Sequence, residues 1–319
     1  MTSTVSHQSV QPPSAKLTRG LARAISSVEN AYATFDQALA SVRESEPMTR
    51  ALPAYVIGIT GPPGAGKSTI VDRMIEHFRA RSESVAVVAV DPSSPFTHGA
   101  VLGDRVRMQR HSGDAAVYIR SMASREAGGG LAPATRDVVQ LIDAAGFDII
   151  IVETVGVGQV ELEVVAVADV IVVATVPALG DGVQTIKAGL TEIADIFVVN
   201  MADRPGANRT ATDLKHMVRE SNRDVPVLAT IAIEGKGIVE LIAALDARRG
   251  ADDEVHSMRS VRFDVIRTVR DESVKKATRL LETEQALAIL NRLRDRSATR
   301  AGVKETLLNF VLREISGAH

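Results

Sequence analysis

Residues 61–68 read Gly61-Pro62-Pro63-Gly64-Ala65-Gly66-Lys67-Ser68, and the apolar run Tyr55-Val56-Ile57-Gly58-Ile59 stands shortly before them. This is the pattern of a P-loop, in which glycines let successive backbone N–H groups curl around a phosphate at a helix N-terminus. The apolar run supplies the preceding strand, and residues 69–80 supply the helix. We expect Lys67 to reach the β- and γ-phosphates and the Ser68 hydroxyl to bind Mg²⁺. The stretch predicts nucleotide contacts from Gly61, Pro62, Pro63, Gly64, Ala65, Gly66, Lys67, Ser68 and Thr69.

Outward from the P-loop, residues 55 to 249 alternate short apolar runs with helical stretches. The runs are rich in valine and isoleucine, as in parallel strands that are covered on both faces. Because strands that alternate with long helices form doubly wound sheets, we predict an α/β fold with a mainly parallel sheet. The expected strands are 55–60, 85–90, 117–120, 148–153, 170–176, 196–200 and 227–232, and the expected helices are 69–80, 131–145, 183–194, 207–221 and 238–249.

The two ends of the chain differ from this central part. Residues 1–16 are polar and predict a disordered tail, whereas residues 17–45 have helical spacing. After residue 250 the strand signal ends, and apolar residues recur at helical spacing, as in Met258, Val261 and Val265. Such a stripe packs against the chain's own core or forms a subunit interface. We therefore expect a tail at 1–16, an N-terminal helical extension at 17–50, a P-loop domain at 51–250 and a C-terminal helical arm at 251–319.

The composition excludes several classes of function. The net charge is −2 and the isoelectric point is about 6.4, so the sequence has no basic footprint for nucleic acid or an anionic membrane. The absence of cysteine excludes disulfides, thiolate metal sites and cysteine catalysis. No apolar run approaches the roughly 18 residues that span a bilayer, and the N-terminus lacks the apolar core of a signal peptide. These features predict a cytoplasmic protein.

Candidate phosphate and metal residues follow other strands, at the edge where an open α/β sheet binds its ligand. Asp91 ends the second strand and is suited to hold Mg²⁺ or its water shell, although an aspartate there can also cap a turn. Asp104 lies in a glycine-bordered loop that can rearrange with the γ-phosphate. Residues 153–159, Glu-Thr-Val-Gly-Val-Gly-Gln, resemble the Asp-x-x-Gly switch II of GTPases. There Glu153 can hold a magnesium-bound water, and the Gly156 N–H can sense the γ-phosphate.

The sixth strand ends in a candidate base-recognition motif, Asn200-Met201-Ala202-Asp203, which matches the Asn-Lys-x-Asp guanine motif except at Met201. Asp203 can accept hydrogen bonds from guanine N1–H and N2–H₂, a pair that adenine does not present, so the motif predicts GTP rather than ATP. The flexible thioether of Met201 can replace the packing of a lysine stem on the base. The next strand ends in Ile231-Ala232, where many GTPases have Ser-Ala, and the Ala232 N–H can still contact guanine O6.

In order and spacing, the P-loop, Asp91-Pro-Ser-Ser, Leu102-Gly-Asp-Arg, Glu153-Thr-Val-Gly-Val-Gly-Gln and Asn200-x-Ala-Asp resemble the MeaB/ArgK family. These are SIMIBI-type GTPases that act as chaperones of adenosylcobalamin-dependent acyl-CoA mutases. The resemblance covers residues 17–319. It implies GTP hydrolysis that is coupled to gating of adenosylcobalamin transfer into a mutase, and to protection or rescue of that mutase.

The resemblance also implies particular residues and an assembly. The Mg²⁺ site would use Ser68, Asp91, Asp104 and Glu153, with GTP or GDP as the bound nucleotide, while adenosylcobalamin belongs to the partner mutase. The homodimer would form through the C-terminal helical arm. A third switch segment corresponds to residues 177–187, with Asp181, Gln184 and Lys187 as its candidate site residues.

Phosphoryl transfer needs positioning and charge neutralisation rather than covalent chemistry by the protein. Lys67, Mg²⁺ and the loop amides can neutralise charge. Ras-type GTPases place a glutamine directly after the switch II glycine, but here Val157 stands there, so Gln159 is the candidate for positioning water; a hydrogen bond within the loop is its alternative role. The predicted catalytic residues are Lys67, Asp104, Glu153 and Gln159. We expect slow intrinsic hydrolysis that a partner accelerates by ordering the switches.

Three alternatives stay open at the level of sequence. A nickel-insertion GTPase of the same fold class would use Cys and His ligands, whereas this chain has no Cys and its seven His are dispersed. An ArgK-like ATPase or kinase is disfavoured by the Asn200/Asp203 pair. A nucleotide-stabilised scaffold without catalysis is disfavoured by the intact phosphate and metal residues. The residues do not select one acyl-CoA mutase among the B12-dependent enzymes.

Overall fold

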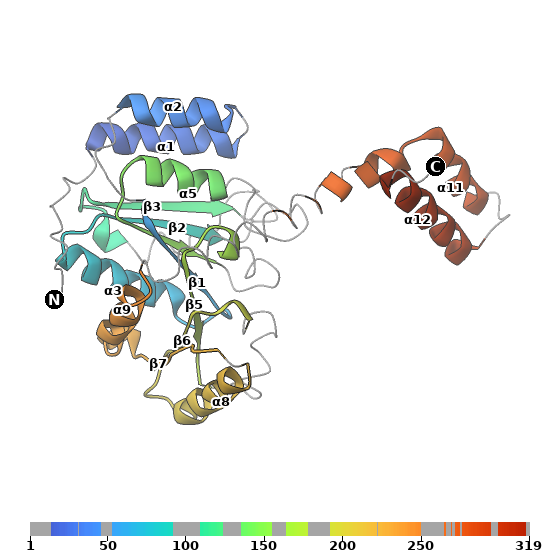
Figure 1. The fold of residues 1–319 in the computed structure, drawn as a ribbon. Helices are drawn as coiled ribbons and strands as arrows, with labels where there is room; N and C mark the ends of the chain where they lie inside the picture. Colours follow the sequence, from blue (N-terminus) through green and yellow to red (C-terminus); the bar gives the residue numbers. More distant parts are fainter. Residues whose placement is uncertain are drawn as a thin grey trace, which may run out of the picture. The chain divides into compact units, whose positions relative to one another are not determined.

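The computed structural model describes residues 14–30, 32–45, 53–91, 109–123, 135–154, 164–177, 192–221, 223–249, 265, 269, 272–274, 276–294 and 299–316 (Figure 1). The chain forms two compact units, Met1–Ser257 and Met258–His319, which are considered separately below. Among the helices in these ranges, none is long and apolar enough to cross a membrane.

The first unit is built on a parallel sheet of seven strands, in the order β3-β2-β4-β1-β5-β6-β7. This confirms the predicted α/β fold with a doubly wound parallel sheet. Strand β1 lies between β4 and β5, so the loop that follows β1 has the ends of both neighbours beside it. The strands are β1 (Tyr55–Thr60), β2 (Val85–Asp91), β3 (Val117–Ala123), β4 (Ile149–Glu153), β5 (Val170–Thr175), β6 (Ile196–Val199) and β7 (Val227–Ala229).

Helices cover both faces of this sheet, so the central strands β1, β4 and β5 are buried at every position and mostly apolar. Figure 1 shows α1 (Ala15–Glu29) and α2 (Phe35–Ser45) stacked over α5 (Thr135–Ala144) on one face, with α3 (Lys67–Ala80) and α9 (Ile238–Asp246) on the other. In β4, Ile150 and Val152 join the core under α5, whereas Ile149 and Ile151 join the core under α3. Helix α8 (Ala207–Glu220) contributes Leu214 to the first of these cores.

The N-terminal extension is two helices, and the helical spacing of residues 17–45 does not mark the boundary between them. The break lies at residues 30–34, and a capping box starts the second helix there. The Thr34 N–H donates to Gln37 Oε1 at 3.0 Å, and the Gln37 N–H donates to Thr34 Oγ1 at 3.4 Å. Such reciprocal bonds satisfy backbone donors that a helix start leaves open. Leu21 and Ile25 of α1 are fully buried, so this hairpin is part of the domain core.

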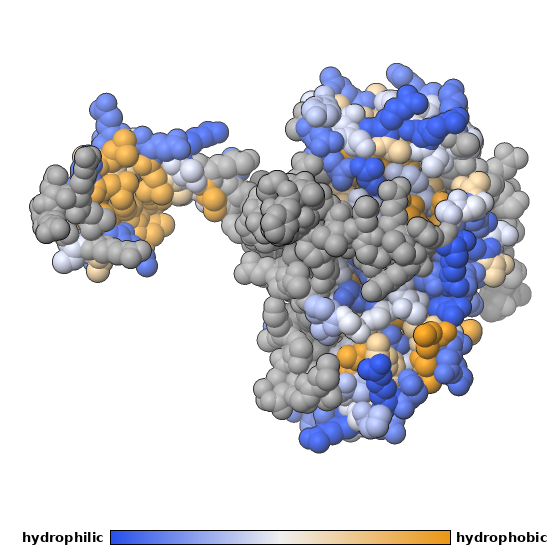
Figure 2. All heavy atoms as spheres, turned by 180° about the vertical axis from the view of Figure 1, so that it is seen from behind, coloured by the Kyte–Doolittle hydropathy of each residue, from blue (hydrophilic) through white to orange (hydrophobic). Residues whose placement is uncertain are grey.

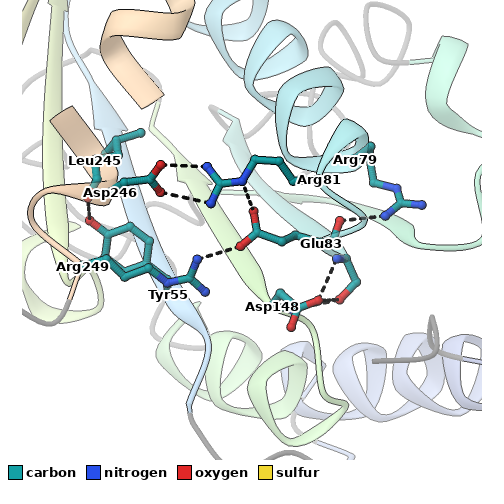
Figure 3. Close-up of polar contacts among 9 residues, drawn as sticks. Tyr55, Arg79, Arg81, Glu83, Asp148, Leu245, Asp246 and Arg249 are labelled. Carbon is teal, nitrogen blue, oxygen red and sulfur yellow. Dashed lines mark hydrogen bonds and ion pairs between the residues drawn. The ribbon is translucent and has the colours of Figure 1, made fainter. Parts of the chain in front are cut away.

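A charged network closes the amino end of the sheet, opposite the P-loop (Figure 3). Buried Glu83 forms ion pairs with Arg249 at 2.7 Å and with Arg81 at 3.2 Å, and Arg81 continues to Asp246 at 2.8 Å. The Tyr55 hydroxyl donates to the Leu245 carbonyl at 3.0 Å. Burial, assisted by nearby carboxylates, raises the pKa of Tyr55. These contacts join the end of α9 to the starts of β1 and β2.

The second unit contains α11 (Glu284–Arg294) and α12 (Arg300–Ser316), which pack on each other. Ala286, Val303 and Val311 are buried between its elements. Figure 2 shows apolar residues gathered on one face of this unit. The exposed apolar side chains of the unit include Val274, Leu281, Leu287, Leu290, Leu308 and Leu312.

Candidate functional site

The P-loop has the backbone that its glycines predict. Gly61 has φ +136°, and a Cβ there would lie 1.9 Å from the Ala174 carbonyl oxygen. Gly66 precedes α3 with φ +79°, and a Cβ there would lie 2.3 Å from Asn200 Nδ2. Both positions combine a left-handed backbone with a close neighbour, so each excludes a side chain. The loop therefore delivers the N-terminus of α3 to the carboxyl edge of the sheet, where backbone N–H groups can receive a phosphate.

Lys67, the first residue of α3, is buried and folds back over the loop. Its Nζ donates to the Gly61 carbonyl at 2.7 Å and to the Pro62 carbonyl at 3.1 Å. These carbonyls hold the ammonium at the loop, beside the helix terminus. A phosphate that binds there meets a charge already in position, and positioning of charge is the main contribution that phosphoryl transfer requires of a protein.

A hydroxyl and a carboxylate meet beside the P-loop. The Ser68 hydroxyl donates to Glu153 Oε1 at 2.8 Å, and both residues are buried. Glu153 ends β4, and in the sheet register it lies opposite Ala89 of β2. Asp91 is therefore two residues further along the neighbouring strand, at the same edge. Oxygen ligands of this kind suit Mg²⁺, so the donor set fits the predicted ion. Within the described ranges, no three His, Asp or Glu side chains gather into a metal-binding group.

Two buried threonines join the end of β4 to the end of β1. Thr154 Oγ1 donates to Thr60 Oγ1 at 2.8 Å, and the Thr154 N–H donates to the Ile59 carbonyl at 3.1 Å. The first residue after Glu153 is thus fixed to the strand that carries the P-loop. Thr154 stands inside the switch II string of residues 153–159, but the spacing of that string does not predict this contact.

Asn200, at the end of β6, joins the P-loop to the loop that follows β7. Its Nδ2 donates to the Ala65 carbonyl at 3.0 Å. Its Oδ1 accepts from Thr230 Oγ1 at 3.0 Å and from the Ala232 N–H at 3.1 Å. Asn200 is buried, so its side chain fixes the P-loop relative to the loop that follows β7, which is the loop predicted to contact the base.

Comparison with known proteins places this geometry in a family. Residues 21–283 match the family model described as methylmalonyl Co-A mutase-associated GTPase MeaB. The chain belongs to the MeaB family. A MeaB-family protein is a GTPase, so this chain binds guanine nucleotide and hydrolyses GTP.

Individual relatives agree with the family and the fold. A protein of Pyrococcus abyssi is 53% identical over 230 residues, which are 70% of this chain and 69% of that protein. The fused isobutyryl-CoA mutase of Cupriavidus metallidurans is 35% identical over 247 residues, which are 73% of this chain and 22% of that protein. A solved structure of the LAO/AO transport system kinase has a TM-score of 0.62 at 25% identity and covers 93% of this chain and 95% of its own.

The predicted base residues of this MeaB-family GTPase lie together at the ends of β6 and β7. Met201 has φ +55°, a left-handed conformation that is uncommon for a residue with a side chain. Asp203 is exposed. A hydrogen bond and attraction from Glu234 raise the pKa of Lys236, and Asp203 adds a smaller attraction. The Ala232 N–H already donates to Asn200, so a contact with guanine O6 requires this N–H to be shared.

Several predicted residues lie outside the described part of the MeaB-family chain. They are Asp104, Gly156, Gln159, Asp181, Gln184 and Lys187, together with the side chain of Asp91 and most of the predicted helix at 183–194. The described residues bring together Gly61 to Ser68, Glu153, Asn200 and Ala232 at one edge of the sheet. The roles of all these residues stay predictions.

Proposed function

We propose that this MeaB-family GTPase is a chaperone that gates adenosylcobalamin delivery to a B12-dependent acyl-CoA mutase and protects or reactivates that mutase. The observation that carries the proposal is the relative in Cupriavidus metallidurans, in which a region similar to this chain is part of a fused isobutyryl-CoA mutase. Fusion keeps two modules at high effective concentration, and separate chains can achieve the same contact through a binding surface. The description of the family as mutase-associated agrees.

For the reaction itself, we propose that Ser68, Asp91, Asp104 and Glu153 hold Mg²⁺. Support comes from the 2.8 Å contact between Ser68 and Glu153 and from the neighbouring ends of β2 and β4. The ion would neutralise phosphate charge. Lys67 would exchange its loop carbonyls for phosphate oxygens, and the loop N–H groups would cradle the phosphates. Gly156 would sense the γ-phosphate, and Gln159 would position water.

At the base, we propose that Asp203, Asn200 and the Ala232 N–H recognise guanine. Asn200 supports this assignment because it links the base loop to the P-loop through the Ala65 carbonyl. The nucleotide would then lie along the carboxyl edge from β1 to β7, where open α/β sheets bind their ligands.

We also propose that the protein is a homodimer through its C-terminal helices. The exposed leucines of α11 and α12, among them Leu287, Leu290, Leu308 and Leu312, support an interface because apolar patches of this kind are usually covered in assemblies. Light scattering tests this proposal. The wild type should have the mass of a dimer, and the double variant Leu287→Asp, Leu308→Asp should have the mass of a monomer. A monomeric wild type contradicts it.

GTP turnover with and without a B12-dependent acyl-CoA mutase tests the chaperone proposal. We expect slow turnover by the isolated protein and faster turnover when the mutase is added, with Lys67→Ala inactive in both. If several such mutases leave the rate unchanged, the proposal is wrong. Faster turnover of ATP than of GTP would favour the ArgK-like ATPase, and stimulation by Ni²⁺ would favour the nickel-insertion GTPase.

The third switch gives a finer test of partner coupling. We propose that Lys187 pairs with a switch carboxylate when the partner binds. Lys187→Ala should then weaken the stimulation by the mutase more than it weakens GDP affinity. Equal loss of both would refute this role.

A further inference from the structure

The loop that follows β7 is held from outside by an arginine of the P-loop helix. Arg73 Nε donates to the Ala232 carbonyl at 3.1 Å, and Arg73 Nη2 donates to the Ile233 carbonyl at 2.7 Å. Arg73 lies on α3, the helix that begins with Lys67 and Ser68. The helix that carries the phosphate-binding residues thus also binds the proposed base loop, residues 230–234.

This loop has few other anchors among its side chains. Residues 232–234 form a short 3₁₀ turn that the Gly235 N–H closes by donating to the Ala232 carbonyl at 3.1 Å. Ala232 is buried, but the Ile233 side chain is 75% exposed. Two carbonyls of this turn also accept from outside it: that of Ala232, in addition to its bond from Gly235, and that of Ile233. The planar fork of an arginine can serve two carbonyls at once, and Arg73 does so here.

Hydrogen bonds hold Ala232 on both sides. Its N–H donates inward to Asn200 Oδ1 at 3.1 Å, and its carbonyl accepts outward from Arg73. The two peptide groups of this residue are therefore fixed in orientation. Because a hydrogen bond weakens steeply when its angle departs from linearity, the direction of the Ala232 N–H depends on both partners.

Arg73 is itself held in place by a cluster of charges. Its Nη1 forms an ion pair with Glu76 Oε2 at 2.9 Å, and the other oxygen of Glu76 pairs with Arg110 Nη1 at 2.6 Å. Arg110 also binds Asp72, which accepts from Arg110 Nε at 2.6 Å. The guanidinium of Arg73 therefore loses little further freedom when it holds the loop. A lysine in its place would have a single rotating donor group.

We propose that Arg73 is a positioning residue that determines the preference for guanine, by fixing the orientation of Ala232 so that guanine O6 can share its N–H with Asn200. Guanine presents the O6 acceptor where adenine presents the N6 amino donor, so a fixed N–H at this place favours guanine. Arg73 acts through the loop and has no contact with the nucleotide. The inference rests on the proposed function, in which residues 230–232 lie against the base.

Calorimetric titration of Arg73→Ala with GDP, IDP and ADP tests the proposal. Guanine and hypoxanthine both carry O6, so GDP and IDP should bind about five- to tenfold more weakly than to wild type, the loss of about one hydrogen bond. ADP lacks O6, so its affinity should stay within about twofold. Arg73→Lys keeps the charge but not the fork, so it should lose GDP affinity by an intermediate factor.

Controls separate a positioning role from a structural one. Arg209→Ala removes an arginine that is 88% exposed and should bind all three nucleotides as wild type does. The melting temperature of nucleotide-free Arg73→Ala should stay close to that of wild type. If Arg73→Ala weakens GDP, IDP and ADP by the same factor, or none of them, Arg73 has no role in base selection and the proposal is overturned.

Asp203→Asn distinguishes failure of the inference from failure of the base assignment. This variant loses the carboxylate that accepts from guanine N1–H and N2–H₂, so it should lose the preference for GDP over ADP. If it keeps that preference, the assigned base site is wrong and the inference falls with it. If Asp203→Asn loses the preference and Arg73→Ala keeps it, only the role of Arg73 is wrong.

Discussion

Replacing Asn200 by alanine should separate the phosphate loop from the base loop. The substitution removes the donor to the Ala65 carbonyl at 3.0 Å and the acceptor of the Thr230 hydroxyl and the Ala232 N–H, at 3.0 and 3.1 Å. All of these groups lie in the buried interior around Asn200. A neutral hydrogen bond contributes about 1 kcal/mol net, so the loss is about 3 kcal/mol.

This loss is divided between two measurable quantities. If the loops stay in place without their bonds, the nucleotide-free protein is destabilised and GDP affinity changes little. If the loops move apart, the stability of the nucleotide-free protein changes little, and GDP binding must bring the loops back together. For about 3 kcal/mol, GDP then binds up to about 140-fold more weakly. By the thermodynamic cycle, the two losses add up in the GDP-bound protein. Its free energy of unfolding should therefore fall by about 3 kcal/mol whichever path is taken.

Urea unfolding of GDP-saturated protein, combined with calorimetric GDP titration, measures both parts. Asn200→Asp keeps the acceptor for Thr230 and Ala232 but places an oxygen against the Ala65 carbonyl, so it should break only the link to the P-loop. Asn208→Ala, at an exposed position of α8, is the matched control. If GDP-bound Asn200→Ala unfolds within about 1 kcal/mol of wild type, these three bonds do not hold the site together.

Three further predictions concern the fold that carries the site. Glu83→Ala leaves Arg81 and Arg249, which are 32% and 27% exposed, without their shared carboxylate. The free energy of unfolding should fall by about 2 kcal/mol, a value between those for surface and buried ion pairs, and the melting temperature by about 4–8 °C. Glu76→Ala, which removes an exposed ion pair, should lower the melting temperature far less. Burial raises the pKa of Tyr55 above its ordinary value of 10.0. Above pH 10 the Tyr55 hydroxyl therefore ionises only in the unfolded chain, so the wild type should lose stability as the pH rises further. In urea unfolding at alkaline pH, Tyr55→Phe should lose less stability than the wild type. A hydrogen bond from Arg79 lowers the pKa of Asp114 below its ordinary 3.8. The stability that ionised Asp114 contributes is therefore present above pH 3.8 and is lost as the pH falls through the lowered pKa. Asp114→Asn should flatten the acid limb of the curve of stability against pH, and an unchanged limb would contradict this assignment.

The sheet could be predicted from sequence because its signal is local. The run of residues 149–152 is apolar at every position, and the structure shows both faces of β4 covered. The P-loop could also be predicted, since Gly61 and Gly66 stand where a Cβ has no room. The sequence predicts N-terminal helices but not the boundary between them, because the apolar spacing does not mark it; the capping box of Thr34 and Gln37 sets that boundary.

Contacts between segments that are distant in the chain could not be predicted from the sequence. Arg73 and the Ala232 carbonyl are 159 residues apart, and Glu83 and Arg249 are 166 residues apart. No spacing rule connects such positions, because only the order of strands in the sheet brings them together. Ser68 and Glu153 are also distant in sequence, 85 residues apart, but their contact could be anticipated because both residues stand in motifs that place them at the carboxyl edge.

The most direct test of the central claim is the Mg²⁺ dependence of single-turnover GTP hydrolysis by wild type and by Glu153→Gln. The claim is that Glu153, beside Ser68, supports the metal at the carboxyl edge of this GTPase. Loss of such a carboxylate should lower the rate or the metal affinity by about 10- to 100-fold, while GDP affinity without Mg²⁺ stays that of wild type. A Glu153→Gln protein with the wild-type rate and the wild-type Mg²⁺ midpoint would contradict the account.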